Sequence, residues 1–179
     1  MMKKRFLYAG VIAIVVFVLD QATKLWILAK IPYGSEKPVI SGFFDIIHTR
    51  NTGAAFGLLA GANSSFRVPF FYTIAAVAAV VIVLVLWKIA EDSGTVVACA
   101  LVLGGIAGNI ADRIRLGSVV DFLSFHVRDE VFSQTIFGYN LRFPLSWPAF
   151  NVADMAITAA VVLLLISGFS KKTVVGADK

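Results

Sequence analysis

Cysteine and histidine, which most often form disulfides or bind metals, are almost absent from this chain of 179 residues. The single cysteine, Cys99, cannot form an internal disulfide, and with no histidine close to it in sequence we expect a small packing residue. The two histidines, His48 and His126, are isolated, and no HExxH pair is present. This pattern excludes a zinc hydrolase and predicts neither metal nor other cofactor. We expect His48 at the surface or among lipid headgroups.

Charge is also scarce. Charged residues make up 15% of the chain, hydrophobic residues make up 59%, and the mean hydropathy is +0.85. These values exclude an ordinary soluble domain and indicate a membrane protein. A membrane span needs about 20 mostly apolar residues. Four segments approach that length, at residues 6–28, 68–87, 95–111 and 152–169. The sequence therefore predicts a mainly α, polytopic protein with four transmembrane helices in one domain, residues 1–179.

The basic residues predict an orientation rather than a nucleic-acid partner. Lys3, Lys4 and Arg5 precede the first span, and Lys171 and Lys172 follow the last. Basic flanks are typical of the cytoplasmic side, so both termini are predicted there. The net charge of +5 then reflects orientation and lipid headgroups. No small-x-small cleavage site follows the first apolar run, so we interpret that run as an uncleaved span.

In this topology, residues 29–67 and 112–150 form external loops, and the polar residues of the spans converge near the outer face. Ionisable residues at the end of a span are costly and are therefore candidates for function. The converging residues come from the first, third and fourth spans: Asp20, Lys24, Asn109, Asp112, Arg113, Asn151 and Asp154. The sequence predicts one polar site at the depth of the outer leaflet.

The external loops contain short β-rich segments. Residues 31–49 predict two strands near the membrane surface, and the run Asn51-Thr52-Gly53 predicts a tight turn. Residues 56–62 are apolar and predict a short interfacial helix. Residues 119–125 favour a strand, and residues 129–148 an external loop or hairpin. Together they predict a small β-rich cradle outside the membrane.

The residues leave structural alternatives open. Asp20 and Lys24 stand one helical turn apart, which favours a structural ion pair over a catalytic lysine. Asp112 and Arg113 could form an ion pair at a helix end, and Asp121 could be a solvated loop acid. Asn151 could cap the fourth span, with Asp154 stabilised in its first turn.

Two aspartates offer the most plausible chemistry. No serine hydrolase motif GxSxG is present, and a dyad of Lys24 with Ser118 or Ser124 has no supporting spacing. Asp121 and Asp154 are predicted at the same outer rim. Two carboxylates in a poorly hydrated site share one proton, so one can activate water while the other protonates the substrate.

The chain resembles the bacterial lipoprotein signal peptidases, also called signal peptidase II. The resemblance covers nearly the whole chain and rests on five motifs in the family's order: Asp20-Gln21-x-x-Lys24, Asn51-Thr52-Gly53-Ala54-Ala55-Phe56, Gly108-Asn109-x-x-Asp112-Arg113, Val120-Asp121-Phe122 and Phe150-Asn151-Val152-Ala153-Asp154. The resemblance implies an aspartic endopeptidase of the bacterial inner membrane with Asp121 and Asp154 as its catalytic pair. It implies two further groups, a substrate-contacting or supporting set (Asn51, Gly53, Asn109, Arg113, Asn151 and Ala153) and a structural polar set (Asp20, Lys24 and Asp112).

The implied substrate is a prolipoprotein whose lipobox cysteine carries a diacylglyceryl group, with cleavage just before that cysteine. The resemblance also implies sensitivity to the cyclic peptide globomycin, and we expect a monomer in contact with membrane lipid. Residues 127–145 form a longer stretch than is usual in the family. Two competing functions remain. A small proton-linked transporter would place polar residues through the midplane, and a serine–lysine peptidase using Lys24 would survive the loss of Asp121.

Overall fold

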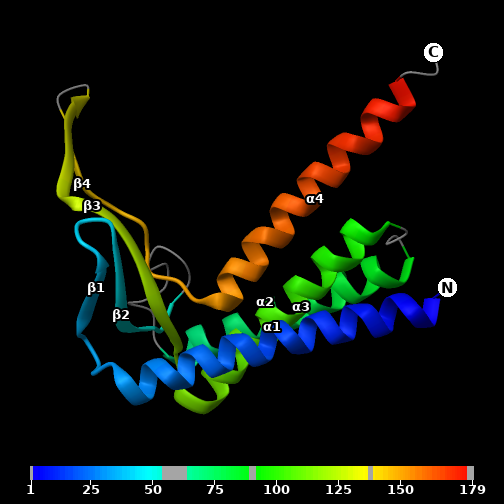
Figure 1. Cartoon of the computed structure of the whole chain (residues 1–179), viewed down its shortest axis with the longest axis horizontal. Helices are drawn as coiled ribbons and strands as arrows, with labels where there is room; N and C mark the ends of the chain where they lie inside the picture. The colour runs from blue at the N-terminus through cyan, green and yellow to red at the C-terminus, as the bar shows by residue number, and fades with distance from the viewer. Residues whose placement is uncertain (1, 54–63, 89–91, 137–138, 177–179) are drawn as a thin grey trace.

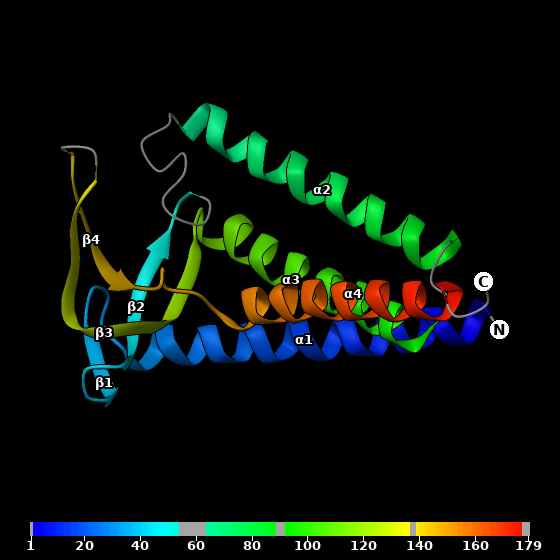
Figure 2. The same ribbon diagram turned by 90° about the horizontal axis from the view of Figure 1, so that it is seen from above.

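The computed structural model describes residues 2–53, 64–88, 92–136 and 139–176, and Figure 1 shows helices at one end and a sheet at the other. The order along the chain is α1 (Met2–Lys30), β1 (Glu36–Ile40), β2 (Phe44–Asn51), α2 (Ser64–Lys88), α3 (Ser93–Leu116), β3 (Val119–Ile136), β4 (Tyr139–Ser146) and α4 (Val152–Gly176). The first residues of α1 and the last residues of α4 lie at the end of the molecule opposite the sheet (Figure 2).

Three helices of the described residues are long and apolar enough to cross a membrane: Lys4–Lys30, Val68–Lys88 and Ser93–Leu116. The predicted fourth span lies in α4, whose described apolar part, Val152–Ser167, is shorter than those three. The predicted interfacial helix at residues 56–62 lies outside the described residues.

Helix α3 is central to the bundle, contacting α1, α2 and α4. Glycines on α3 allow the close approach of its neighbours. A Cβ on Gly104 would lie 2.7 Å from the carbonyl oxygen of Ala13 in α1, and one on Gly105 would lie 2.7 Å from that of Ala153 in α4. Small residues at such crossings are typical of helices that pack in lipid. Cys99 is fully buried among apolar residues, which confirms its packing role.

The helices extend past the predicted spans, and the extension at the end of α3 affects the site. Residues 112–116 were expected in an external loop, but α3 continues through Leu116. It ends at Gly117, which adopts a left-handed conformation (φ 71°) and donates its N–H to the carbonyl of Arg113. Glycine tolerates this conformation without steric strain. The extra helical turn keeps Asp112 and Arg113 on the α3 framework and fixes their direction.

The four strands form an antiparallel sheet in the order β1-β2-β3-β4, which confirms the predicted strands of the cradle. The first half of β3 pairs with β2, where Asp121 lies opposite Thr49. Its second half pairs with β4, so the hairpin alternative for residues 129–148 is confirmed. His48 was expected at the surface, but it is 4% exposed because its Nδ1 lies 2.8 Å from the carbonyl oxygen of Ile31 and its ring packs edge-on against Tyr33.

The link between the sheet and α4 positions the site. Phe150 pairs with Leu123 of β3 through backbone hydrogen bonds in both directions, at 2.9 and 3.1 Å. The next residue, Asn151, begins the cap of α4. The start of α4 is therefore fastened beside the segment of β3 that carries Asp121.

Candidate active site

A fully buried ion cluster lies beneath the site. The ammonium of Lys24 lies 2.8 Å from Asp20 and 3.1 Å from Asp112, and it donates to the side-chain oxygen of Asn109 at 3.0 Å. Asp20, Lys24 and Asp112, which we call the Lys24 cluster, each have 0% exposure. Three acceptors match the three protons of an ammonium group. The structural ion pair predicted between Asp20 and Lys24 is confirmed, whereas Asp112 pairs with Lys24 and Arg115 and forms no ion pair with Arg113 among the described residues.

The two acids of this cluster also hold the backbone beside the candidate catalytic residues. Asp112 accepts the backbone N–H of Val120 at 3.0 Å, immediately before Asp121. Asp20 accepts the backbone N–H of Ala153 at 2.9 Å, immediately before Asp154. Ala153 is fully buried, so its contribution within the described structure is this amide. The Lys24 cluster therefore fixes the positions from which both aspartates project.

Gln21 also belongs to this network. It is part of the motif Asp20-Gln21-x-x-Lys24, but no role was predicted for it. Its amide nitrogen donates to Asp20 at 3.1 Å, to the carbonyl of Gly108 at 3.1 Å and to Asp112 at 3.2 Å. Its position directly after Asp20 in the motif could have indicated that it contacts the same acids.

Two asparagines connect the cluster to the candidate pair. Asn109 donates to the carboxylate of Asp154 at 2.9 Å, and Asn151 donates to that of Asp121 at 2.7 Å. Asn151 also donates to Asn109 at 3.3 Å. Each aspartate thus accepts a hydrogen bond from a neutral amide, which holds its carboxyl group in place without neutralising it.

Asn151 caps α4 as predicted. Its side-chain oxygen accepts the backbone N–H of Asp154 at 3.0 Å, and Asp154 in turn accepts the backbone N–H of Asn151 at 3.3 Å. This reciprocal arrangement is a capping box at a helix N-terminus. Asp154 therefore has the structural role considered from the sequence and, with its other oxygen held by Asn109, also lines the candidate site.

Asp121 and Asp154, which we call the pocket pair, have no ion-pair partner among the described residues. Asp121 is 2% exposed, so the interpretation of a solvated loop acid was wrong. Burial raises the pKa of Asp121 to about 7, the negative charge of Asp154 contributes to the rise, and hydrogen bonds from Asn51 and Asn151 oppose it. A carboxyl group with this pKa exchanges protons near neutral pH.

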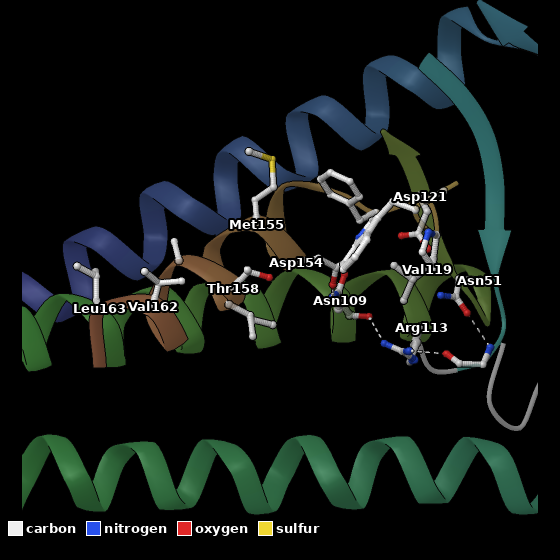
Figure 3. A pocket seen from close by; sticks show the side chains of 17 residues that line it. Asn51, Asn109, Arg113, Val119, Asp121, Asp154, Met155, Thr158, Val162 and Leu163 are labelled. Carbon is white, nitrogen blue, oxygen red and sulfur yellow. Dashed lines mark hydrogen bonds between the residues drawn. The ribbon is translucent and has the colours of Figure 1, made fainter. Parts of the chain in front are cut away.

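Both aspartates line one cavity of about 930 Å³, shown in Figure 3. Its polar end contains the pocket pair with Asn51, Asn109 and Arg113, and its wall runs along α4 through Met155, Thr158, Val162 and Leu163. Trp147 also lines the cavity. The cavity therefore joins a polar end to a long apolar wall.

The predicted turn after β2 forms one side of the polar end. The Asn51 side chain accepts the backbone N–H of Gly53 at 2.9 Å, and the carbonyl of Gly53 accepts a hydrogen bond from Arg113 at 3.3 Å. Lys24, in contrast, donates to no serine among the described residues, so the structure does not assemble the dyad with Ser118 or Ser124. No group of His, Cys, Asp and Glu that could hold a metal occurs within the described part of the chain.

The chain is similar to known proteins over nearly its whole length. The family model described as signal peptidase (SPase) II matches residues 12–170. A lipoprotein signal peptidase from Syntrophus aciditrophicus is 40% identical over 172 residues, covering 96% of this chain and 98% of that protein. One from Tolumonas auensis is 41% identical over 175 residues, covering 98% and 94%.

A solved structure agrees with these matches. It is described as a bacterial membrane enzyme determined by the in meso method at 2.3 Å resolution. The two sequences are 32% identical, and the match covers 92% of this chain and 89% of the solved one. The two structures superpose with a TM-score of 0.73.

Proposed function

The chain belongs to the signal peptidase II family, and we propose that it removes the signal peptide of diacylglyceryl-modified prolipoproteins by an aspartic mechanism at the pocket pair. The family resemblance found in the five motifs is confirmed, and with it a protease that acts on prolipoproteins. The cut falls just before the lipidated cysteine. Four transmembrane helices, the fourth being α4, place both termini in the cytoplasm and the pocket near the outer face of the bacterial inner membrane.

One observation carries this proposal. Of the acids around the site, Asp20 and Asp112 form ion pairs with Lys24, whereas Asp121 and Asp154 line the cavity without a cation partner among the described residues. Two carboxyl groups that share a poorly hydrated cavity retain one proton between them, because two like charges are unfavourable there. The pocket pair then contains one base and one acid at the same time.

The reaction follows from that state. The ionised carboxylate removes a proton from water, and the water oxygen attacks the carbonyl carbon of the scissile peptide bond. The protonated carboxyl group gives its proton to the carbonyl oxygen, which forms a tetrahedral intermediate. When the C–N bond breaks, the aspartate that took the proton from water gives it to the leaving nitrogen, and the other aspartate takes a proton from a hydroxyl group of the intermediate. The new carboxyl and amino groups depart, and the pair is left with one proton again.

The shape of the cavity supports this substrate class. The apolar wall from Met155 to Leu163 lies along a helix that faces lipid, and it can receive an apolar signal segment or acyl chains arriving through the bilayer. The lipid anchor holds the scissile bond at a fixed depth, so the membrane supplies much of the orientation. A cyclic peptide of the globomycin type would compete for the same cavity.

The test compares purified parent enzyme with Asp121→Asn and Asp154→Asn on a diacylglyceryl-modified prolipoprotein. We expect each substitution to lower the cleavage rate by about 10³-fold or more while substrate binding and folding persist. Asp45→Asn, on the sheet and outside the cavity, is the matched control and should cleave at the parental rate. Near-parental cleavage by either pocket variant would contradict the aspartic mechanism and favour the serine–lysine alternative. A parent that does not cleave would reopen the transporter alternative.

A further inference from the structure

The guanidinium of Arg113 lies where three elements meet. It donates to the carbonyl of Gly53 after β2 at 3.3 Å and to the carbonyl of Asn109 in its own helix at 3.5 Å, as Figure 3 shows. Its central carbon lies 4.7 Å from the centre of the Phe71 ring of α2. The same guanidinium lines the cavity that contains the pocket pair.

The two hydrogen bonds alone hold this side chain weakly. Both are long, and Arg113 forms no ion pair with a carboxylate among the described residues. A guanidinium has five N–H groups, so donors remain for a substrate carbonyl. A ring face within about 6 Å attracts a guanidinium, and the attraction strengthens when water is excluded. The Phe71 ring is therefore a substantial restraint on the direction of Arg113.

The Phe71 ring is itself fixed by the helix that carries it. Phe70 packs edge-on against it, with ring centres 5.5 Å apart. Beside the ring is a small void of about 20 Å³, lined by Thr52, Phe71, Arg113 and their neighbours. A smaller side chain at position 71 would enlarge this void and leave the guanidinium free to turn away from the cavity.

We propose that Phe71 is a positioning residue of the peptidase, holding the Arg113 guanidinium by its ring face so that Arg113 can donate to a backbone carbonyl of the bound substrate. This inference rests on the proposed function. Phe71 does not line the main cavity, so it acts through Arg113 rather than by touching the substrate. Through Phe71, helix α2 contributes to the site.

The test is a double-mutant cycle on a diacylglyceryl-modified prolipoprotein. We expect Phe71→Leu, which keeps apolar bulk but removes the ring, to lower kcat/KM about tenfold, and Phe71→Tyr, which keeps the ring face, to stay within about twofold of the parent. Phe66→Leu makes the same change in an exposed ring of the same helix and should also stay within twofold. In an Arg113→Gln background, Phe71→Leu should change kcat/KM by less than twofold.

The outcomes separate the inference from the proposed function. If Phe71→Leu lowers kcat/KM by the same factor with and without Arg113, or if Phe71→Tyr fails to restore activity, Phe71 acts by packing and the inference is wrong. Where turnover in the Arg113→Gln background is too slow to measure, the Kd of the prolipoprotein in the Asp121→Asn background gives the same cycle. A parent enzyme that cleaves while the cycle is additive overturns only the inference, whereas an inactive parent overturns both.

Discussion

The Lys24 cluster and the pocket pair each contain two aspartates, and Asp121 of the pair is nearly as buried as the acids of the cluster, yet the two groups are built in opposite ways. In the cluster, both acids are fully buried and form ion pairs with Lys24, at 2.8 and 3.1 Å, and Asp112 also pairs with Arg115. In the pair, Asp121 and Asp154 accept hydrogen bonds from neutral amides and line a cavity. Burial alone therefore does not distinguish a structural acid from a reactive one. The partner of each acid does.

The two groups are joined through the backbone. Asp112 holds the N–H that precedes Asp121, and Asp20 holds the N–H that precedes Asp154. The ion pairs of the cluster are fully buried and bonded to the backbone, so the cluster can hold the pair in place while the pair gains and loses protons. We therefore expect changes in the cluster to lower stability at every pH, and changes in the pair to alter activity and the pH dependence of stability.

The largest expected effect is on the cluster. Lys24→Met leaves Asp20 buried without a cation and Asp112 with Arg115 alone, and breaking a buried ion pair in this way destabilises proteins by about 3–5 kcal/mol. We expect a lower midpoint of denaturation in detergent micelles. Adding Asp20→Asn to the same chain removes the unpaired negative charge and should recover part of the loss. A Lys24→Met protein that denatures at the parental midpoint would show that the cluster does not support the fold.

The pocket pair should make the stability of the fold depend on pH. The pKa of Asp121 is about 7 in the fold and about 3.9 in an unfolded chain. The folded state therefore binds more protons between about pH 4 and 7, and stability falls as pH rises through that window. Asp121→Asn removes this loss, so the variant should exceed the parent in stability above pH 7, by up to about 4 kcal/mol at about 1.4 kcal/mol per pKa unit.

Denaturation midpoints measured from pH 4 to 8 test this prediction. Asp112→Asn is the matched control from the cluster, and it should lower stability across the whole range because it removes a partner of Lys24. A parent whose midpoint does not change with pH, or Asp121→Asn with an unchanged slope, would count against a proton held by the pair.

A third change tests how tightly the cluster is packed. A Cβ on Gly108 would clash with Oδ2 of Asp20, so Gly108→Ala must displace an oxygen of the cluster. Overpacking of this kind destabilises proteins by about 1–3 kcal/mol. A Cβ on Gly10 in α1 would meet nothing within 4 Å, so Gly10→Ala is a control with unchanged or slightly higher stability. Equal midpoints for the two variants would contradict the close approach of α1 and α3.

Residue patterns predicted which residues form the site better than they predicted which residues pair with one another. Hydrophobic runs located the helices, and the motifs identified Asp20, Lys24, Asp121 and Asp154. The pairing of Asp112 with Lys24 rather than Arg113 could not be predicted from spacing. It depends on the close approach of α1 and α3 at Gly108, which is a tertiary contact.

The other wrong or missing predictions also concern residues whose roles depend on tertiary contacts. His48 lies in a short polar-flanked segment that is typical of a surface strand, yet the end of α1 and Tyr33 cover it. The role of Phe71 has no local signal, because a phenylalanine in an apolar span resembles every other one until Arg113 is placed over its ring. The link through Phe150 that sets Asn151 beside Asp121 is likewise a long-range pairing.

The smallest expected effect concerns Asn151. This residue has both a structural role, because it caps α4, and a role in the site, because it donates to Asp121. Asn151→Ser keeps a side-chain oxygen that caps a helix well, so the contribution of the cap to stability should change by no more than about 0.5 kcal/mol. The amide donor to Asp121 is lost, and kcat should fall about fivefold, equivalent to about 1 kcal/mol. Asn151→Ala, which loses the cap as well, should destabilise by about 1 kcal/mol in addition. The two variants lose the same amide donor and differ only in the cap. Equal denaturation midpoints for the two variants would therefore show that the cap contributes nothing to stability. A parental kcat in both variants would show that Asp121 does not depend on this amide.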